Sequence, residues 1–173
     1  MSMGTSGGAH ERAAFEEFAH AQAGRFARLA YVLTGHREAT RDLVQETLVA
    51  LWRAWPKVCA ADNPGAYARR VMVNTHLMQV RRHRVDEVLV DAPEASAGDD
   101  HAARHAESDA MRQALDRLSP RQRTVLVLRF YEGLGDAEIA SVLRCRQSSV
   151  RSLATRGIAA LRTSGPITTG RST

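Results

Sequence analysis

The sequence predicts an all-α protein built from two small helical domains that a flexible acidic linker joins. Apolar residues recur at spacings of three and four along most of the 173 residues, and residues typical of helix caps and helix ends bound these segments. No segment shows convincing alternation of apolar and polar side chains, which a half-buried strand would require. The length fits one domain or two small ones, and a hydrophobic content of 44% suffices for folded cores.

Charge divides the chain into three parts. Residues 11–84 hold 12 basic and seven acidic side chains, residues 85–108 hold one and seven, and residues 109–163 hold ten and five. The middle segment is rich in Ala, Asp, Glu and Ser and lacks helical periodicity, which is typical of a linker. The expected division in chain order is a flexible tail at 1–10, a domain at 11–84, a linker at 85–108, a domain at 109–165 and a flexible tail at 166–173.

Composition disfavours several classes of protein. No apolar run approaches the roughly 18 residues that span a bilayer, and the first residues lack the pattern of a secretory signal, so we expect a cytoplasmic protein. Cys59 and Cys145 are too few for a disulfide framework. His101 and His105 have the spacing of two zinc ligands, but they lie in the predicted linker without a cysteine partner. We therefore expect no metal site and no cofactor, and the absence of a Gly-rich phosphate loop or an HExxH motif indicates that the protein is not an enzyme.

The first domain is predicted to contain three helices. In the first, apolar residues recur at helical spacing from Phe15 to Leu33, and Gly35 stands where a helix would end. The second carries an apolar stripe from Leu43 to Trp55, and Pro56 is expected to stop it.

The third predicted helix begins with Asn63 as its N-cap and Pro64 at its first position, and it runs from about Gly65 to Arg84. One face is expected to carry Tyr67, Val71, Thr75 and Met78, with Tyr67 in the core rather than exposed as a platform for base stacking.

The second domain is predicted to be helical as well. Its first three segments are a short helix marked by Met111, Leu115 and Leu118, a helix from Ser119-Pro120 to Gly133, and a short helix with Ile139, Ala140 and Leu143 turned inward. A turn at residues 144–146 and a last helix from about Gln147 to Arg162 complete the pattern of a helix-turn-helix.

The last helix is the strongest candidate for a DNA contact. One face is small and apolar, and the other carries hydroxyl, amide and guanidinium groups, which suit phosphates and base edges in a major groove. These candidate residues are Gln147, Ser148, Ser149, Arg151, Ser152, Thr155 and Arg156. The alternative is an ordinary solvated face, but such a face normally contains acidic residues and none occurs from Leu143 to Thr173.

The helix at 65–84 is a second candidate. Its arginines suit phosphates, and the polar Asn74, His76 and Gln79 suit base edges. The arginines of this set are Arg69, Arg70, Arg81, Arg82 and Arg84. Arginines at a helix end also complement the helix dipole on a solvated surface, and the residues alone leave both interpretations open.

A third surface is predicted on the second helix, in the segment GHREATRDLVQETLVALWRAW. Asp42, Gln45 and Glu46 lie beside its apolar stripe and give a mixed face suited to a protein partner. A solvated helix flank is the alternative interpretation of so common a pattern.

Four segments occur in an order and at a spacing that are highly specific as a set. They are DLVQETLVALWRAW, NPGAYARRVMVNTHL with a following RRHR, LDRLSPRQRTVLVLRFYEGLGDAEIASVL, and SSVRSLATRGIAALR. Over about residues 12–162 they resemble the extracytoplasmic-function (ECF) sigma factors of RNA polymerase, most of all the SigE-like branch. The resemblance implies a subunit that binds core RNA polymerase through the largest-subunit clamp and the second-largest subunit, and that recognises −10 and −35 promoter elements and aids promoter melting. It also implies control by an anti-sigma factor.

The resemblance implies a role for each candidate surface. Asp42, Gln45 and Glu46 would face the coiled coil of the polymerase clamp. The arginines of the helix at 65–84, with Asn74 and Gln79, would contact the −10 region, and the segment Val58–Asn63 would be a loop that holds an unstacked base. The last helix would read the −35 element. The acidic linker would thread towards the RNA exit path, because its carboxylates are attracted to a channel that binds RNA phosphates, although a solvated spacer remains the alternative.

In the second domain, two residues depart from the pattern of that family. Arg144 stands at a turn position where the family usually has Gly, and Ser148 replaces another common Gly. A left-handed residue other than Gly costs about 1 kcal/mol, so the turn is expected to be slightly reshaped. Two other functions remain open from the residues: a stand-alone helix-turn-helix regulator, and a polymerase-binding adaptor without promoter recognition.

Overall fold

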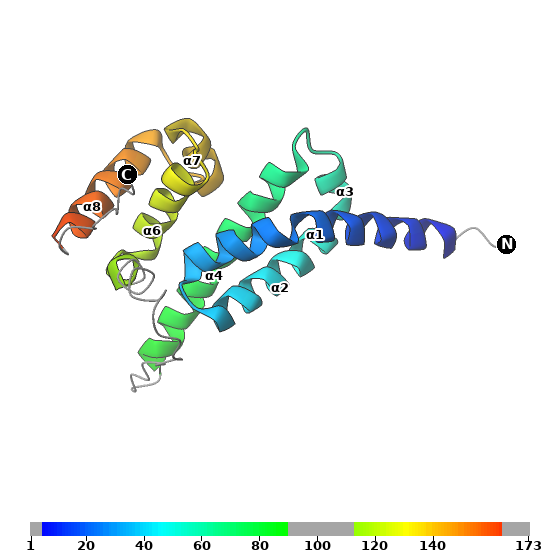
Figure 1. The fold of residues 1–173 in the computed structure, drawn as a ribbon, viewed down its shortest axis with the longest axis horizontal. Helices are drawn as coiled ribbons and strands as arrows, with labels where there is room; N and C mark the ends of the chain where they lie inside the picture. The colour runs from blue at the N-terminus through cyan, green and yellow to red at the C-terminus, as the bar shows by residue number, and fades with distance from the viewer. Residues whose placement is uncertain (1–4, 90–112, 164–173) are drawn as a thin grey trace, which may run out of the picture. The chain divides into compact units, whose positions relative to one another are not determined.

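The computed structural model describes residues 5–89 and 113–163, and both ranges are helical, without a strand in either (Figure 1). The all-α prediction is therefore confirmed for the described residues. The chain divides into two compact units, Met1–His76 and Leu77–Thr173, and the boundary between them falls inside one long helix. No helix in the two described ranges combines the length and the apolar character needed to cross a membrane. The predicted linker from residue 90 onward and the tail at 166–173 lie outside the described residues.

The N-terminal unit is organised around α1 (Thr5–Thr34) and α2 (Arg37–Arg53), which pack against each other. Helix α1 starts within the segment that was expected to be a tail. Residues 8–13 of this helix are exposed and bury no apolar stripe. Apolar periodicity, the signal on which the prediction relied, is therefore missing from this part of the helix. The helix ends at the predicted place, because Gly35 takes a φ of +77° and its N–H donates to the carbonyl of Tyr31 at 2.7 Å.

The segment around Pro56 differs from the prediction. Helix α2 ends at Arg53, and Pro56 lies in the first turn of a separate short helix, α3 (Trp55–Cys59). Proline lacks an N–H, which the first turn of a helix does not need, so Pro56 begins a helix here rather than stopping one. Val58 is fully buried in α3, so the prediction that the loop starts at residue 58 is wrong and the loop spans residues 60–63. Lys57 is exposed on α3.

Helix α4 (Pro64–Leu89) begins as predicted, with the Asn63 Oδ1 accepting a hydrogen bond from the N–H of Ala66 at 2.9 Å. It continues five residues beyond the predicted end at Arg84. The buried apolar side chains of this unit are Phe26, Leu29, Ala30, Leu33, Leu43, Leu51, Trp55, Val58, Ala68, Met72 and Val73. Phe15 of α1 adds edge-on contacts to Trp52 and Trp55, with ring centroids 5.1 and 5.2 Å apart.

After the end of α4, the described chain resumes with a helical turn at residues 113–116 and α6 (Pro120–Leu126), which belong to the C-terminal unit. The predicted cap is confirmed: the Ser119 hydroxyl accepts from the N–H of Gln122 at 3.3 Å, and the Gln122 side chain accepts from the N–H of Ser119 at 2.9 Å. The chain continues through a wide π-helical turn, η1 (Val127–Tyr131), which ends near Gly133 at φ +69°. Met111, one marker of the short helix, lies outside the described residues.

The helices α7 (Asp136–Leu143) and α8 (Gln147–Arg162) follow, and α8 packs against both α6 and α7. Ile139 and Ala140 are buried as predicted, whereas Leu143 is half-buried and Val142 takes the third inward position. The predicted bounds of α8 are confirmed.

Candidate nucleic-acid and polymerase interfaces

The helix-turn-helix is closed by backbone hydrogen bonds in the turn between α7 and α8. Arg144 takes the left-handed conformation, with φ 49° and ψ 51°, and the N–H of Cys145 donates to the carbonyl of Ala140 at 3.0 Å. This bond from the second residue after the helix back into its last turn is typical of a Schellman ending. Arg146 is extended and starts α8 without a side-chain cap. The turn therefore consists of the three residues that the sequence predicted.

One face of α8 is fixed against the rest of the C-terminal unit. Val150, Ala154 and Gly157 are buried on this face. A Cβ at Gly157 would lie 3.0 Å from Cδ1 of Leu126, so the absence of a side chain there lets α8 approach α6 closely. This packing determines which side of α8 is presented to solvent.

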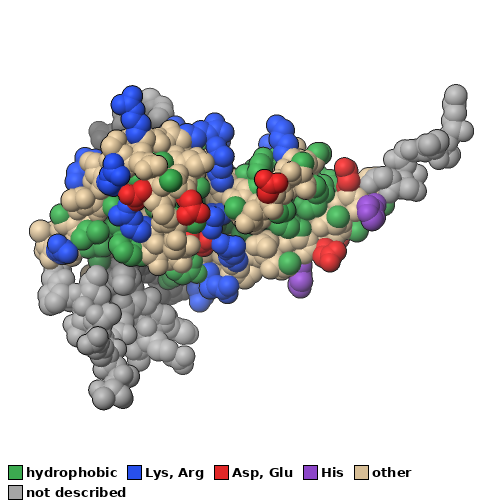
Figure 2. Space-filling model, turned by 90° about the horizontal axis from the view of Figure 1, so that it is seen from above, with side chains coloured by type: hydrophobic (Ala, Val, Ile, Leu, Met, Phe, Trp, Pro, Cys, Tyr) green, Lys and Arg blue, Asp and Glu red, His purple; other side chains and the backbone are tan. Residues whose placement is uncertain are grey.

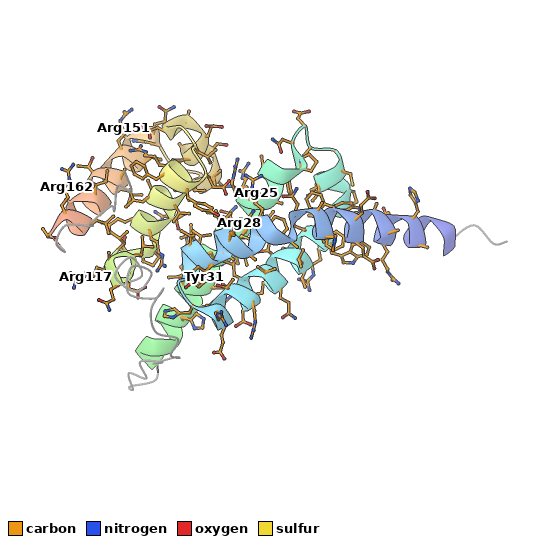
Figure 3. All side chains as sticks on the ribbon, viewed as in Figure 1. Arg25, Arg28, Tyr31, Arg117, Arg151 and Arg162 are labelled. Carbon is orange, nitrogen blue, oxygen red and sulfur yellow. The ribbon has the colours of Figure 1, made fainter. Side chains whose placement is uncertain are left out.

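The opposite face of α8 holds the predicted DNA-contact residues. All seven are exposed: Gln147, Ser148, Ser149, Arg151, Ser152, Thr155 and Arg156. The Nε of Arg156 donates to the carbonyl of Ser152 at 3.3 Å, one turn earlier on the same helix. Basic side chains stand on the surface of the C-terminal helices, at the left of Figure 2, and Arg151 and Arg162 project from opposite ends of α8 in Figure 3.

The carboxylates of α7 are held by other groups. Asp136 pairs with Arg129 of η1, and Glu138 accepts a hydrogen bond from the N–H of Gly135 at 2.8 Å. Since α8 itself has no acidic residue, the exposed face of this helix is positively charged without a local counter-charge of its own.

Helix α4 presents a different face from the one predicted. The buried residues are Ala68, Met72, Val73 and His76, whereas Met78 is 52% exposed and Tyr67 is half-buried. The prediction that Tyr67, Val71, Thr75 and Met78 form the apolar face in the core is therefore wrong, including the core position of Tyr67. The prediction that His76 reads bases is also wrong, because His76 is only 6% exposed. The helix carries apolar residues on several sides, which is why periodicity alone did not identify the buried one.

The partly exposed face of α4 combines basic, polar and aromatic groups. Tyr67, Arg70, Asn74, Met78 and Arg81 follow one another at spacings of three and four, so they form one stripe along the helix. Tyr67 and Met78 were not predicted for this stripe, although the same spacing is visible in the sequence. The stripe thus holds an aromatic ring beside two of the predicted arginines and the predicted asparagine.

The remaining predicted residues of α4 lie elsewhere around the helix. Gln79 is nine residues from Arg70, which places it on the side of buried Met72, and Arg69 is half-buried. Arg82 is exposed, and Arg84 lies on the helix but its side chain is not among those described. The guanidinium of Arg25 on α1 lies beside the first turn of α4, since a Cβ at Gly65 would be 3.7 Å from its Nη1 (Figure 3). Helix α1 therefore places one more cation near the start of α4, and the sequence did not predict it.

The third predicted surface lies on α2. Asp42, Gln45 and Glu46 are all exposed, while Leu43, Thr47 and Leu51 are buried on the opposite side. The exposed stripe continues at helical spacing through Val49 and Trp52, which are 45% and 41% exposed. Trp52 is held in place by its edge-on contact with Phe15. The mixed polar and apolar face predicted on this helix is therefore present.

The described ranges contain no group of three or more His, Cys, Asp or Glu side chains placed to hold a metal ion. The pair His101 and His105, which was weighed as a zinc site, lies outside these ranges. Cys59 is exposed on α3, and Cys145 in the helix-turn-helix turn is half-buried; both are free thiols.

Comparisons with known proteins match both units. Residues 19–85 match the family described as Sigma-70 region 2, and residues 108–161 match Sigma-70, region 4. The RNA polymerase sigma-E factor of Streptomyces avermitilis is 33% identical over 149 residues, which cover 86% of this chain and 83% of the relative. The sigma-E factor of Streptomyces coelicolor is 31% identical over 148 residues, covering 86% and 84%.

Solved structures show the same fold. The sigma factor RpoE from Bartonella quintana, in complex with the anti-sigma factor NepR, superposes with a TM-score of 0.71 at 21% identity, covering 87% of this chain and 95% of that chain. CnrH, in complex with the cytosolic domain of CnrY, gives 0.58 at 22% identity and covers 88% and 87%.

A chain with these two regions, these relatives and a helix-turn-helix in its second unit is a sigma factor, a subunit that directs RNA polymerase to promoters for transcription initiation. It belongs to the extracytoplasmic-function (ECF) family of RNA polymerase sigma factors.

Proposed function

We propose that this sigma factor reads a two-part promoter, with α8 in the major groove of the −35 element and the exposed stripe of α4 on the −10 element. The observation that carries the proposal is the division of α8 into two faces. Its buried face packs on α6 and α7, and its exposed face offers seven polar or basic side chains with no acidic residue. Such a helix can enter a major groove without repelling the phosphates.

On α4, the arginines Arg70 and Arg81 bind phosphates of the −10 strand, and Asn74 between them contacts a base. Tyr67 lies on the same stripe and is half-buried, and we assign its ring to stacking against an unpaired base. The loop at residues 60–63, just before α4, then holds a base that has left the duplex. Arg69, Arg82 and Arg84 are assigned to the flanks of this surface, whereas Gln79, on the opposite side of α4, is left out of it.

The face of α2 docks on the clamp coiled coil of the largest polymerase subunit. Asp42, Gln45 and Glu46 supply polar contacts, and Val49 and Trp52 supply apolar area beside them. A tryptophan held by a neighbouring ring loses little conformational freedom on binding, which favours it as an anchor.

Further partners follow from the relatives. RpoE was solved with the anti-sigma factor NepR and CnrH with a domain of CnrY, so we assign an anti-sigma factor to this chain too. The second-largest polymerase subunit completes the set of protein partners. The protein works in the cytoplasm as a specificity subunit and has no catalytic activity of its own.

Run-off transcription tests the proposal. Core RNA polymerase is supplied with a genomic fragment library, with and without the purified chain. The expected result is a set of transcripts with defined starts that require both components, and weak DNA binding without sequence preference by the chain alone. A stand-alone regulator would instead bind specific duplexes without polymerase, and an adaptor would bind polymerase without changing its start sites. Failure to start from any fragment would contradict promoter recognition.

A further inference from the structure

We propose that Arg144 and Arg146, on the turn between α7 and α8, form a phosphate-binding pair that grips the DNA backbone beside the −35 element. The inference rests on the −35 role proposed for α8 and adds residues to it. Both side chains are exposed, and they flank the half-buried Cys145 at the end of the turn that leads into the DNA-reading helix. They precede the exposed face of α8, so they are placed for the backbone at the groove edge rather than for base edges.

The side chain of Arg144 has no part in closing the turn. The turn is held by the backbone bond from Cys145 to Ala140 at 3.0 Å and a longer one from Arg144 to Ser141 at 3.4 Å. Arg144 is the one residue other than glycine with a positive φ in the ranges 5–89 and 113–163. Glycine would adopt this conformation without a steric cost. The chain therefore carries a guanidinium at a position where its backbone favours glycine.

The nearby carboxylates of α7 do not neutralise Arg144 and Arg146, so both arginines can bind an anion. The carboxylates of α7 are engaged with Arg129 and with the N–H of Gly135, and α8 contains no acid. Guanidinium groups bind phosphate oxygens through two parallel hydrogen bonds, and they keep their charge at any physiological pH. Arg144, Arg146 and the exposed Arg151 thus concentrate positive charge at the turn and in the first turns of α8, and Arg162 lies at the far end of α8 (Figure 3).

The test uses holoenzyme assembled from core polymerase and the full chain, with a promoter duplex that the wild-type holoenzyme selects from the genomic library. The affinity is measured against salt concentration for Arg144→Gln, Arg146→Gln, the double variant and Arg144→Lys. Each lost phosphate contact is expected to reduce the slope of log affinity against log salt by about 0.9 and to weaken binding about fivefold at 0.15 M salt. Arg144→Lys keeps the charge and should retain the slope. Arg162→Gln removes another exposed charge, at the other end of α8, and is the matched control.

A further variant of Arg144 separates turn geometry from charge. Arg144→Gly relieves the left-handed residue, so the melting temperature of the chain is expected to rise while the salt slope falls as in Arg144→Gln. The loss should be equal for promoters with altered −35 bases, because a phosphate contact does not read sequence.

The outcomes distinguish this inference from the function on which it rests. Unchanged slopes for both glutamine variants, with Arg151→Gln weakening binding, would overturn the phosphate pair and leave the −35 assignment standing. Unchanged binding for Arg151→Gln as well would contradict the −35 role of α8 itself.

Discussion

Gly157 determines how closely α8 approaches α6. Replacing it by alanine places a Cβ 3.0 Å from Cδ1 and 3.3 Å from Cγ of Leu126, so one of the two helices must shift. We expect Gly157→Ala to destabilise the protein by about 1–3 kcal/mol, which outweighs the roughly 1 kcal/mol that alanine gains over glycine inside a helix. The free energy of unfolding from urea titration measures the change.

Gly24 is the matched control for this substitution. It is also helical, but a Cβ there would meet only the flexible end of Arg28 at 3.4 Å. Gly24→Ala is therefore expected to stabilise the protein by about 0.5–1 kcal/mol. Equal effects of the two substitutions would contradict the close approach at Gly157.

Arg123 is a buried cation whose partner lies on the preceding helical turn. Burial lowers the pKa of Arg123 from its usual value, and the nearby Asp116 carboxylate opposes this shift by stabilising the charged form. The two groups form an ion pair with a separation of 3.1 Å, and their side chains are 8% and 43% exposed. Asp116→Asn leaves the buried charge without this carboxylate, so we expect a loss of about 1–2 kcal/mol, less than for a fully buried pair because Asp116 is partly solvated.

Thermal unfolding of Asp116→Asn checks this value against Glu17→Gln. Glu17 is exposed on α1, and removing its charge should leave the stability within about 0.5 kcal/mol of the wild type. A change for Asp116→Asn within the same margin would show that the pair does not stabilise the C-terminal unit.

At the scale of helices, the sequence predicted α8 well and α4 poorly, for one physical reason. Small buried residues and polar exposed residues alternate cleanly around α8, so the sequence alone predicts its two faces. Helix α4 has methionines on both sides: Met72 is fully buried and Met78 is 52% exposed. Residue type cannot distinguish these two, since only the packing of α4 against its neighbours decides which one is inside.

The sequence also left two further features undetermined, the role of Pro56 and the π-helical turn, because both depend on backbone conformation. Pro56 suits both the end of one helix and the first turn of the next, and the structure uses the second option. The π-helical turn at Val127–Tyr131 has no sequence signal of its own, so the segment was predicted only as a continuous helix. By contrast, Asn63 and Ser119 carry side chains that cap a helix directly, and both caps were predicted.

The exposed face of α2 permits a test of docking that does not involve DNA. Gln45→Ala with Glu46→Ala removes two side chains that are exposed and have no role in the core, so the fold should be unchanged. We expect the affinity for core polymerase to fall at least about tenfold, because polar groups at the centre of an interface each contribute about 1 kcal/mol or more. Fluorescence anisotropy with purified core polymerase measures it.

The matched control removes two exposed carboxylates from α1. Glu16→Ala with Glu17→Ala changes the net charge more than the docking variant does, so a general electrostatic effect would appear in it first. Equal affinities of wild type and docking variant would refute the role of α2.

At the scale of the whole molecule, the two helices proposed to read DNA, α4 and α8, are expected to act on separate promoter elements. Asn74→Ala on α4 and Arg151→Gln on α8 should each weaken promoter binding by holoenzyme about tenfold, and the double variant about a hundredfold. The effect of Arg151→Gln should vanish on a promoter whose −35 element has been replaced, whereas that of Asn74→Ala should persist. Quantitative binding on the two promoters checks both statements, and a double variant no weaker than one single variant would contradict separate contacts.

The division of charge along the chain gave the first indication of this organisation. Two basic segments separated by residues 85–108, which hold seven acidic side chains against one basic, predicted two DNA-facing domains. The comparisons match a sigma region in each of these segments. The structure was needed where burial decides which side chains are available for contact, as for Tyr67 and His76.

Lys57 allows this arginine-rich chain to be labelled at one chosen side chain. It is the only lysine in the sequence, and it is exposed on α3, three residues before the loop at 60–63. An amine-reactive fluorophore therefore attaches to the protein only there and at the amino terminus. A dye at this position lies next to the segment assigned to the unstacked base, so its emission would follow strand separation at the promoter in real time.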